Sequence, residues 1–453
     1  MPRVPSLAAL VALCIAGAAQ AAPRREPPLI LGGPRPRTTR VVPIDPALPT
    51  GTRMTGTARP EGLPFRRCSF TRPVCVHSAD ALASEAEALL GALEQAYERV
   101  VLALDLPAPP ADALGGTDAL DVYLEPDNAE LVVEADAPLA GPFTRASAFC
   151  RVPPSDPAIA ERSATLCVAE AVALELDASE PPHLRRAFAT SVWWTVGLPT
   201  SLDFEAIDAV QAHPEAAIAT RELNAFSEGA GLFFAYLEAT RSEAEPHQLS
   251  AALFAAAAST PTPGLDFVNE PDLFDVLRHS LDEDRARFAG LMVDFAVARA
   301  FVGDRDDGLH LPGLAWSGRF GRVRFDWKLP FSTLPRRVAV QPPVDSTGAV
   351  LLWLDLDEVG IGASLGFRAE WEAPVQFHWQ LVRVGAHGEE LGRIDVPFQE
   401  RGREAEARVT DLTGARAVLV VGTNLEGIEI AHPFDPDVAP FEPHGVTVYL
   451  VRL

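Results

Sequence analysis

The sequence predicts an α+β protein in which a helix-rich domain precedes an all-β sandwich. Between residues 79 and 301, several segments repeat apolar residues every three or four positions, which is typical of amphipathic helices. From about residue 336, apolar and polar residues alternate, which is typical of strands. The 453 residues suit two or three domains, and because 48% of them are hydrophobic, the chain can bury sizeable cores.

The first 21 residues predict a signal peptide. Met1-Pro2-Arg3 is a short positive region, residues 7–19 are apolar, and Ala19-Gln20-Ala21 fits the cleavage rule. No later segment has about 18 consecutive apolar residues, so we expect no transmembrane segment. The mature protein should therefore be exported, either periplasmic or extracellular.

Residues 22–64 predict a linker, because they are rich in proline and arginine and show no apolar periodicity. We call this basic segment, residues 22–64, the leader. It precedes an acidic body, since the whole chain carries a net charge of −24. The leader could lie on that body or anchor the protein to an anionic surface. The overall negative charge argues against nucleic acid as a partner, because phosphate binding needs a basic surface.

Cysteine usage agrees with export. Four cysteines remain once Cys14 leaves with the signal peptide, and an even number in an oxidising compartment suggests two disulfides. Three pairings are possible, and proximity in the sequence favours Cys68–Cys75 and Cys150–Cys167. Free buried thiols are the alternative.

Apolar spacing places the elements of the helix-rich domain, residues 65–335. Helices are expected at residues 79–104, 162–176, 183–196, 227–241, 247–258, 271–280 and 284–301. Strands are expected at residues 119–124, 130–134 and 143–152. Residues 303–335, which are interrupted by glycines and prolines, predict a connector.

Period-two segments predict a β-sandwich over residues 336–453. Its strands are expected at residues 350–356, 363–371, 375–384, 391–396, 417–421 and 446–451. The tryptophans at 193–194, 371 and 379 fall within these helices and strands, where we expect core positions rather than a sugar-binding platform. A loop at 432–444 contains two histidines and several carboxylates and suits either a cation site or a proline-braced turn.

The order of elements resembles the gluzincin metallopeptidases. In that family one central helix carries H-E-x-x-H and the next carries a glutamate that completes the zinc site. Here Ala169-Glu170-Ala171-Val172-Ala173 matches the first motif with both histidines replaced by alanine. Pro182 to Thr190 matches the glutamate helix, with Arg186 at the ligand position. The resemblance spans about residues 68–453.

These replacements remove the chemistry that the family uses. Ala169 and Ala173 offer no metal ligand, and only Glu170, at the general-base position, remains. An arginine near a dication would be repelled by several kcal/mol, on the order expected at 4 Å and an effective dielectric of 20. Arg186 could instead pair with Glu170 and fill the site. His183, which follows two prolines, is expected at the surface.

We therefore expect a catalytically inactive metallopeptidase-like protein that acts in binding or scaffolding, without metal or cofactor. Its partner would be a peptide, a protein or a surface ligand. Two alternatives stay open. The chain could be an active zinc metallopeptidase whose motif lies in another register, or a surface- or glycan-binding protein that uses its β domain.

Overall fold

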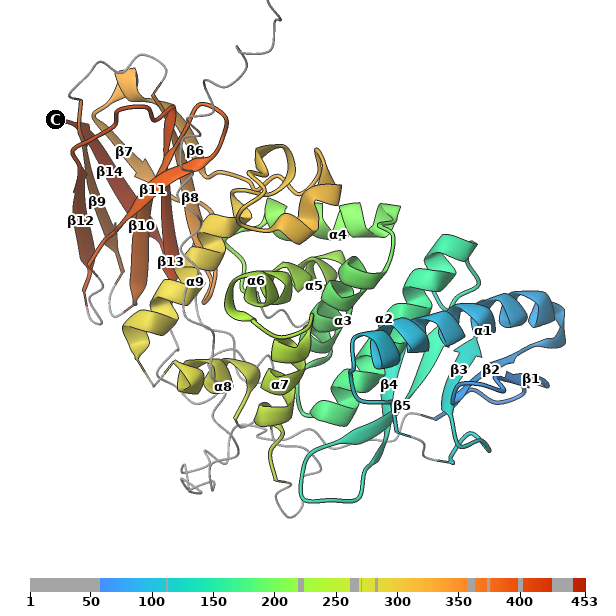
Figure 1. Ribbon diagram of the computed structural model, residues 1–453. Coiled ribbons are helices and arrows are strands. Elements are labelled where there is room, and N and C mark those ends of the chain that lie inside the picture. Colours follow the sequence, from blue (N-terminus) through green and yellow to red (C-terminus); the bar gives the residue numbers. More distant parts are fainter. Residues whose placement is uncertain are drawn as a thin grey trace, which may run out of the picture.

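The structure is a computed structural model that describes residues 58–110, 113–218, 224–260, 269, 271–281, 284–356, 363–372, 375–397, 402–425 and 443–453. The expected signal peptide and the first part of the expected linker lie outside these residues. Both helices and sheets are present, as the α+β class requires, and they divide into a helix-rich N-terminal part and a C-terminal β domain (Figure 1). Within the described residues, none of the helices is long and apolar enough to span a membrane.

A mixed five-stranded sheet forms one end of the N-terminal part, and its strand order is β1-β2-β3-β5-β4. The inner strands β2, β3 and β5 run parallel, whereas β1 and β4 pair antiparallel at the two edges. The strands are β1 (Phe65–Cys68), β2 (Val74–Ser78), β3 (Leu120–Leu124), β4 (Val132–Pro138) and β5 (Ala146–Val152). The inner strands are almost entirely buried, which explains their continuous apolar sequences.

Two disulfides fasten this sheet, with the pairing that proximity favoured. Cys68–Cys75 joins directly opposed residues of β1 and β2. Cys150–Cys167 joins β5 to helix α2.

Helices cover the sheet and form most of the core of the N-terminal part. They are α1 (Ala83–Tyr97), α2 (Pro157–Leu176), α3 (Pro182–Val196), α4 (Ser201–Ala212), α5 (Ala225–Gly229), α6 (Gly231–Arg241), α7 (Gln248–Ala257), α8 (Leu273–Ser280) and α9 (Arg285–Arg299). Short segments of other helix types occur at Asp80–Leu82, Glu98–Ala103, Gly303–Arg305, Pro312–Ser317 and Phe331–Thr333. Helices α1 and α2 pack on the sheet, and α3 packs between α2 and α6 (Figure 1).

Local sequence sets several helix boundaries. Asp156 caps α2, since its carboxylate accepts the backbone N–H groups of Ala158 and Ile159. Helix α4, which the apolar spacing did not predict, begins with a capping box formed by Thr200 and Asp203.

Gly231 allows α6 to approach α3 closely, because a Cβ there would lie 2.9 Å from the carbonyl oxygen of Ala187.

The β domain consists of two sheets that share one apolar core. Their strand orders are β11-β10-β13-β8-β6 and β12-β9-β14-β7. The strands are β6 (Trp327–Pro330), β7 (Arg336–Ala339), β8 (Ala349–Asp355), β9 (Leu365–Trp371), β10 (Phe377–Val384), β11 (Glu390–Asp395), β12 (Glu404–Val409), β13 (Ala417–Asn424) and β14 (Val446–Arg452). The six expected strands are all present, and β6, β7 and β12 are additional.

Helix α9 packs against the outer face of the first sheet, on β10 and β13 (Figure 1). Val293 and Val297 of α9 belong to the same buried cluster as Leu351, Val382 and Val421 of that sheet. The sheet is therefore covered on both faces, and all eight residues of β13 are buried. This shared cluster joins the helical part to the β domain.

Candidate functional site

Glu170 of α2 and Arg186 of α3, the two charged positions of the expected vestigial site, lie against each other in the core. The Nε of Arg186 donates a hydrogen bond to Oε1 of Glu170. The two residues are only 1% and 4% exposed, because the surrounding positions of both helices are also buried. The salt bridge that the sequence suggested for this pair is therefore present.

The other guanidinium nitrogens of Arg186 also have partners. Nη1 donates to Glu228 of α5 over 3.2 Å, and Nη2 donates to the carbonyl oxygen of Leu131 over 2.9 Å. Leu131 directly precedes β4, the edge strand of the mixed sheet. Arg186 thus ties α3 to α2, to α5 and to the sheet.

A second arginine extends this arrangement. Arg162 of α2 donates to Glu228 over 2.7 Å and to Asp203 of α4 over 3.0 Å. Asp203 also accepts hydrogen bonds from the indole N–H groups of Trp193 and Trp194, over 2.9 and 3.1 Å. These residues form what we call the buried ion network, consisting of Arg162, Glu170, Arg186, Asp203 and Glu228.

Sequence reasoning missed three members of the network, Arg162, Asp203 and Glu228. One signal was available, because Arg162 and Glu170 are eight residues apart, which places both on the same side of α2. Charged side chains in a helix that is otherwise apolar on all sides indicate buried pairs. Nothing in the sequence showed that α4 and α5 supply the carboxylates.

The network is compact and strongly coupled electrostatically. Burial acts to lower the pKa of Arg186, but Glu170 and Glu228 outweigh it and raise that pKa, so the guanidinium stays charged. Burial raises the pKa of the Glu170 carboxyl, and the charge of Arg186 limits that rise. Two arginines face three carboxylates, and a buried charge of this kind is stable only when it is paired and hydrogen-bonded.

The residues at these positions do not fit a zinc ion. Ala169 and Ala173 are fully buried and have no donor atom, and Arg186 directs a cation at Glu170. Structural and catalytic zinc sites use cysteine, histidine or carboxylate ligands. Across the part of the chain that the structure describes, there is likewise no group of three such residues that could hold a metal ion.

His183 is buried, so its expected surface position was wrong. It is 2% exposed, and burial, together with nearby Arg185, lowers its pKa to about 3. Pro182 is exposed, but the first turn of α3 after it, from His183 onward, lies within the core. A second polar cluster adjoins it, where Glu180 accepts the backbone N–H of Leu273 over 2.6 Å and burial raises the pKa of Asp177 to about 6.

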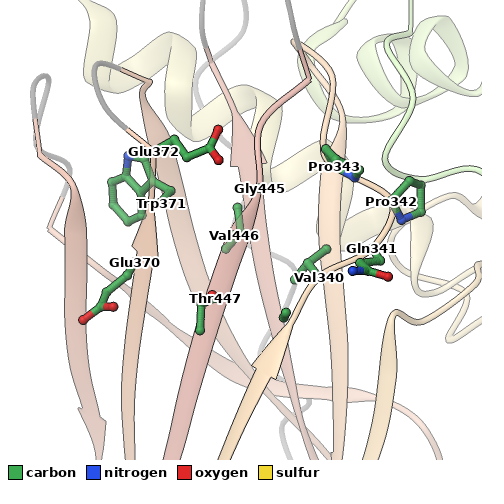
Figure 2. Close-up of a pocket in the computed structure, with 11 residues that line it drawn as sticks. Val340, Gln341, Pro342, Pro343, Glu370, Trp371, Glu372, Gly445, Val446 and Thr447 are labelled. Atoms are coloured by element: carbon green, nitrogen blue, oxygen red, sulfur yellow. The ribbon is translucent and has the colours of Figure 1, made fainter.

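The β domain contains a pocket of about 510 Å³ at the ends of β7, β9 and β14. Figure 2 shows Glu370 and Trp371 at the end of one strand, with Glu372 directly after them, and Val446 and Thr447 on the next strand. Trp371 offers no open face to a sugar, because it is 7% exposed and its indole N–H donates to the Val375 carbonyl over 2.7 Å. The core positions expected for Trp193, Trp194, Trp371 and Trp379 are confirmed.

Most of the acidic loop at 432–444 lies outside the described residues. His444 is described, and its Nδ1 lies 3.4 Å from Oε2 of Glu372, beside the pocket of Figure 2.

Comparisons with known proteins assign no family. No protein-family model and no curated protein matches the chain. Among solved structures, the similarities are weak. The pre-peptidase C-terminal domain of a Bacillus anthracis collagenase is 8% identical, covers 29% of this chain and 97% of its own, and has a TM-score of 0.19.

The enzymatically active domain of tailspike protein 4 from bacteriophage CBA120 is 10% identical and covers 26% of this chain and 16% of its own, with a TM-score of 0.17. A CBM4 structure is 16% identical and covers 26% of this chain and 80% of its own, with a TM-score of 0.15. Similarities at this level assign neither a family nor a function to the chain.

Proposed function

We propose that this chain is an exported, catalytically inactive protein on a metallopeptidase-like scaffold, and that it acts by binding a peptide or protein. The observation that carries the proposal is the set of contacts of Arg186. Its guanidinium is bonded to Glu170, Glu228 and the Leu131 carbonyl, at the position where a gluzincin would need a ligand glutamate. The carboxylate that would activate water is thereby occupied by a permanent cation.

The pairing of Glu170 with Arg186 also supports the proposed alignment with the family. The alignment requires the two positions to face each other across α2 and α3. They do so although sixteen residues separate them. Because both partners are buried, the network also stabilises the contact of α2 with α3 and β4, which suits a rigid binding scaffold.

Metal content per chain tests the proposal. We expect elemental mass spectrometry of chelator-free mature protein to find zinc far below one equivalent, and casein hydrolysis to be absent. About one zinc per chain, with proteolysis that a chelator abolishes, would overturn the proposal and show that the motif lies in another register.

A restored variant provides the matched control. Ala169→His, Ala173→His and Arg186→Glu together recreate the three-ligand donor set of a gluzincin. If the alignment is right, we expect the folded triple variant to bind about one zinc per chain where the wild type binds none. A triple variant with native circular dichroism and no zinc would contradict the alignment.

A further inference from the structure

A second pocket of about 510 Å³ lies where the connector meets the β domain. We call it the cationic pocket and define it by Arg305 after α9, Lys328 of β6, Trp353 of β8 and Arg416 before β13. Its size lies within the range of small-molecule sites. It shares no residue with the buried ion network, so a ligand in this pocket is independent of the function proposed for the chain.

Arg305 is held against two aromatic rings. Its guanidinium carbon lies 4.8 Å from the ring centroid of Phe325 and 5.3 Å from that of Trp353. Among the residues that the structure describes, its buried Nη1 has no hydrogen-bond partner. Such stacking fixes the orientation of a guanidinium while it leaves the N–H groups at the ring edge available to a ligand.

Lys328 is the only lysine among the 453 residues. Its ammonium lies 5.4 Å from the centroid of the same Phe325 ring. Burial and the charges of Arg305 and Arg322 lower the pKa of Lys328, against the opposing charge of Asp304. Burial likewise lowers the pKa of Arg305, and Arg322 adds to this effect while Asp304 opposes it. Within the described residues, neither Arg305 nor Lys328 makes an ion pair.

Asp304 offsets the charges of these two cations only in part. Asp304 is bonded through both oxygens to Arg322, by Nε over 2.8 Å and by Nη2. The remaining titratable groups that line the pocket are Asp355, His387 and Arg416. Within the part of the chain that the structure describes, Arg305 and Lys328 are thus two cations of one pocket without an ion pair, in a chain where 62 acidic residues outnumber 38 basic ones.

We propose that the cationic pocket binds a small molecule through a doubly charged phosphate group. A phosphate offers oxygens to a guanidinium fork and an ammonium together, and its two charges match the two unpaired cations. Trp353, Leu329 and Pro330 supply an apolar wall for the organic part of such a phosphate monoester. Bound phosphate would also relieve the repulsion between Arg305 and Lys328.

The single lysine makes the test specific. Reductive methylation with ¹³C-formaldehyde labels Lys328 and keeps its charge. Loss of one signal in Lys328→Met assigns its resonance, because the labelled α-amino group persists. The ¹³C shift of full-length protein is then titrated against pH in chloride, acetate, inorganic phosphate and phenyl phosphate at equal ionic strength.

We expect inorganic phosphate to raise the pKa of Lys328, phenyl phosphate to do so at lower concentration, and acetate and chloride to have little effect. Arg305→Gln should weaken phosphate binding about tenfold or more. Arg337→Gln removes a cation stacked on Tyr449 outside the pocket and should leave binding unchanged. Equal responses to phosphate and chloride, or to phosphate and acetate, would overturn the proposal, as would unchanged binding in a folded Arg305→Gln variant.

Discussion

His310 of the connector and Glu390 of β11 form an ion pair that joins the helical part to the β domain, with Nε2 2.9 Å from the Glu390 Oε2. The other ring nitrogen lies 2.9 Å from Asp307, and the imidazole stacks on Phe301 with centroids 4.1 Å apart. Arg393 binds the same Glu390 and also Asp294 of α9. One ring is thus held between carboxylates from two parts of the chain.

This pair predicts a pH-dependent stability. Burial acts to lower the pKa of His310, but Asp307 and Glu390 outweigh it and raise that pKa. The stabilisation that protonated His310 gives the fold is therefore fully present below the unfolded-state pKa of about 6.5. It is lost as the pH rises through the higher pKa of the folded state. We expect His310→Gln to lower the free energy of unfolding by about 1–3 kcal/mol near pH 6 and by less near pH 8.5.

Urea denaturation of the two proteins at both pH values measures this difference. His279→Gln is the control, because His279 is exposed on α8. A His310→Gln effect that stays equal at both pH values would show that the imidazolium does not stabilise the contact.

The buried ion network predicts a large cost when one partner is removed. Arg186→Met would leave Glu170 buried beside Glu228 without its cation, which we expect to destabilise the fold by about 3–5 kcal/mol. Adding Glu170→Gln removes one stranded charge, so the double variant should recover part of the loss. The free energy of unfolding in denaturant is measured for the wild type, both single variants and the double variant. The comparison gives the coupling energy between Arg186 and Glu170.

An exposed pair provides the control. Arg368→Met breaks an ion pair with Glu404 in which the arginine side chain is 46% exposed, and we expect a cost of about 1 kcal/mol or less. If Arg186→Met costs no more than this, the network does not stabilise the core.

Sequence periodicity predicted the elements that bury a continuous apolar face. The helices α1, α2, α3 and α9 and the inner strands β3, β5, β8, β10 and β13 follow it closely, whereas β1 and the buried inner strand β2 were not predicted. It missed β12, because Glu404–Val409 is polar and small and gains its place only by pairing with β9. It missed β6 in a segment expected to be a connector, because Trp327–Pro330 is held by parallel pairing with β8, which no local pattern encodes.

For the candidate site, the pair of Glu170 and Arg186 could be predicted from the sequence, whereas the other members of the buried ion network became visible only in the structure. The contact between Glu170 and Arg186 was expected because the resemblance placed each of them on one of two helices that pack together. Glu228 and Asp203 could not be predicted in this way, because their roles depend on where α5 and α4 pack. The buried position of His183 was missed for a related reason, since a Pro-Pro sequence marks a chain break without showing whether that break is covered.

The two disulfides should stabilise the fold by different amounts. Cys150 and Cys167 are 17 residues apart and Cys68 and Cys75 are 7 apart, so the chain-entropy model predicts costs of about 3 and about 2 kcal/mol on removal. We expect Cys150→Ala with Cys167→Ala to lower the thermal midpoint more than Cys68→Ala with Cys75→Ala. Thiol titration of denatured, unreduced mature protein should find no free thiol, and two or more would contradict the pairing.

Arg59 lies near the C-terminal end of the leader and binds the mixed sheet. This contact predicts that the leader is anchored to the sheet at that end. Its guanidinium donates to Asp136 of β4 over 2.7 Å and also bonds Asp121 of β3, which is fully buried and accepts a hydrogen bond from Thr117 over 2.9 Å. Burial acts to raise the pKa of Asp121, but His77, Thr117 and Arg59 outweigh it and lower that pKa. The charged form is thus favoured, and its contribution to stability is present above the unfolded pKa and lost as pH falls.

Replacing this arginine should release the leader without unfolding the protein. We expect Arg59→Gln to lower the free energy of unfolding by about 1–3 kcal/mol, because Asp121 keeps His77 and Thr117 but loses its cation. Limited proteolysis should then cut between residues 58 and 64 faster than in the wild type. Arg66→Gln is the control, since Arg66 reaches only a backbone carbonyl over 3.4 Å. Cleavage at equal rates in both variants would show that Arg59 does not hold the leader on the sheet.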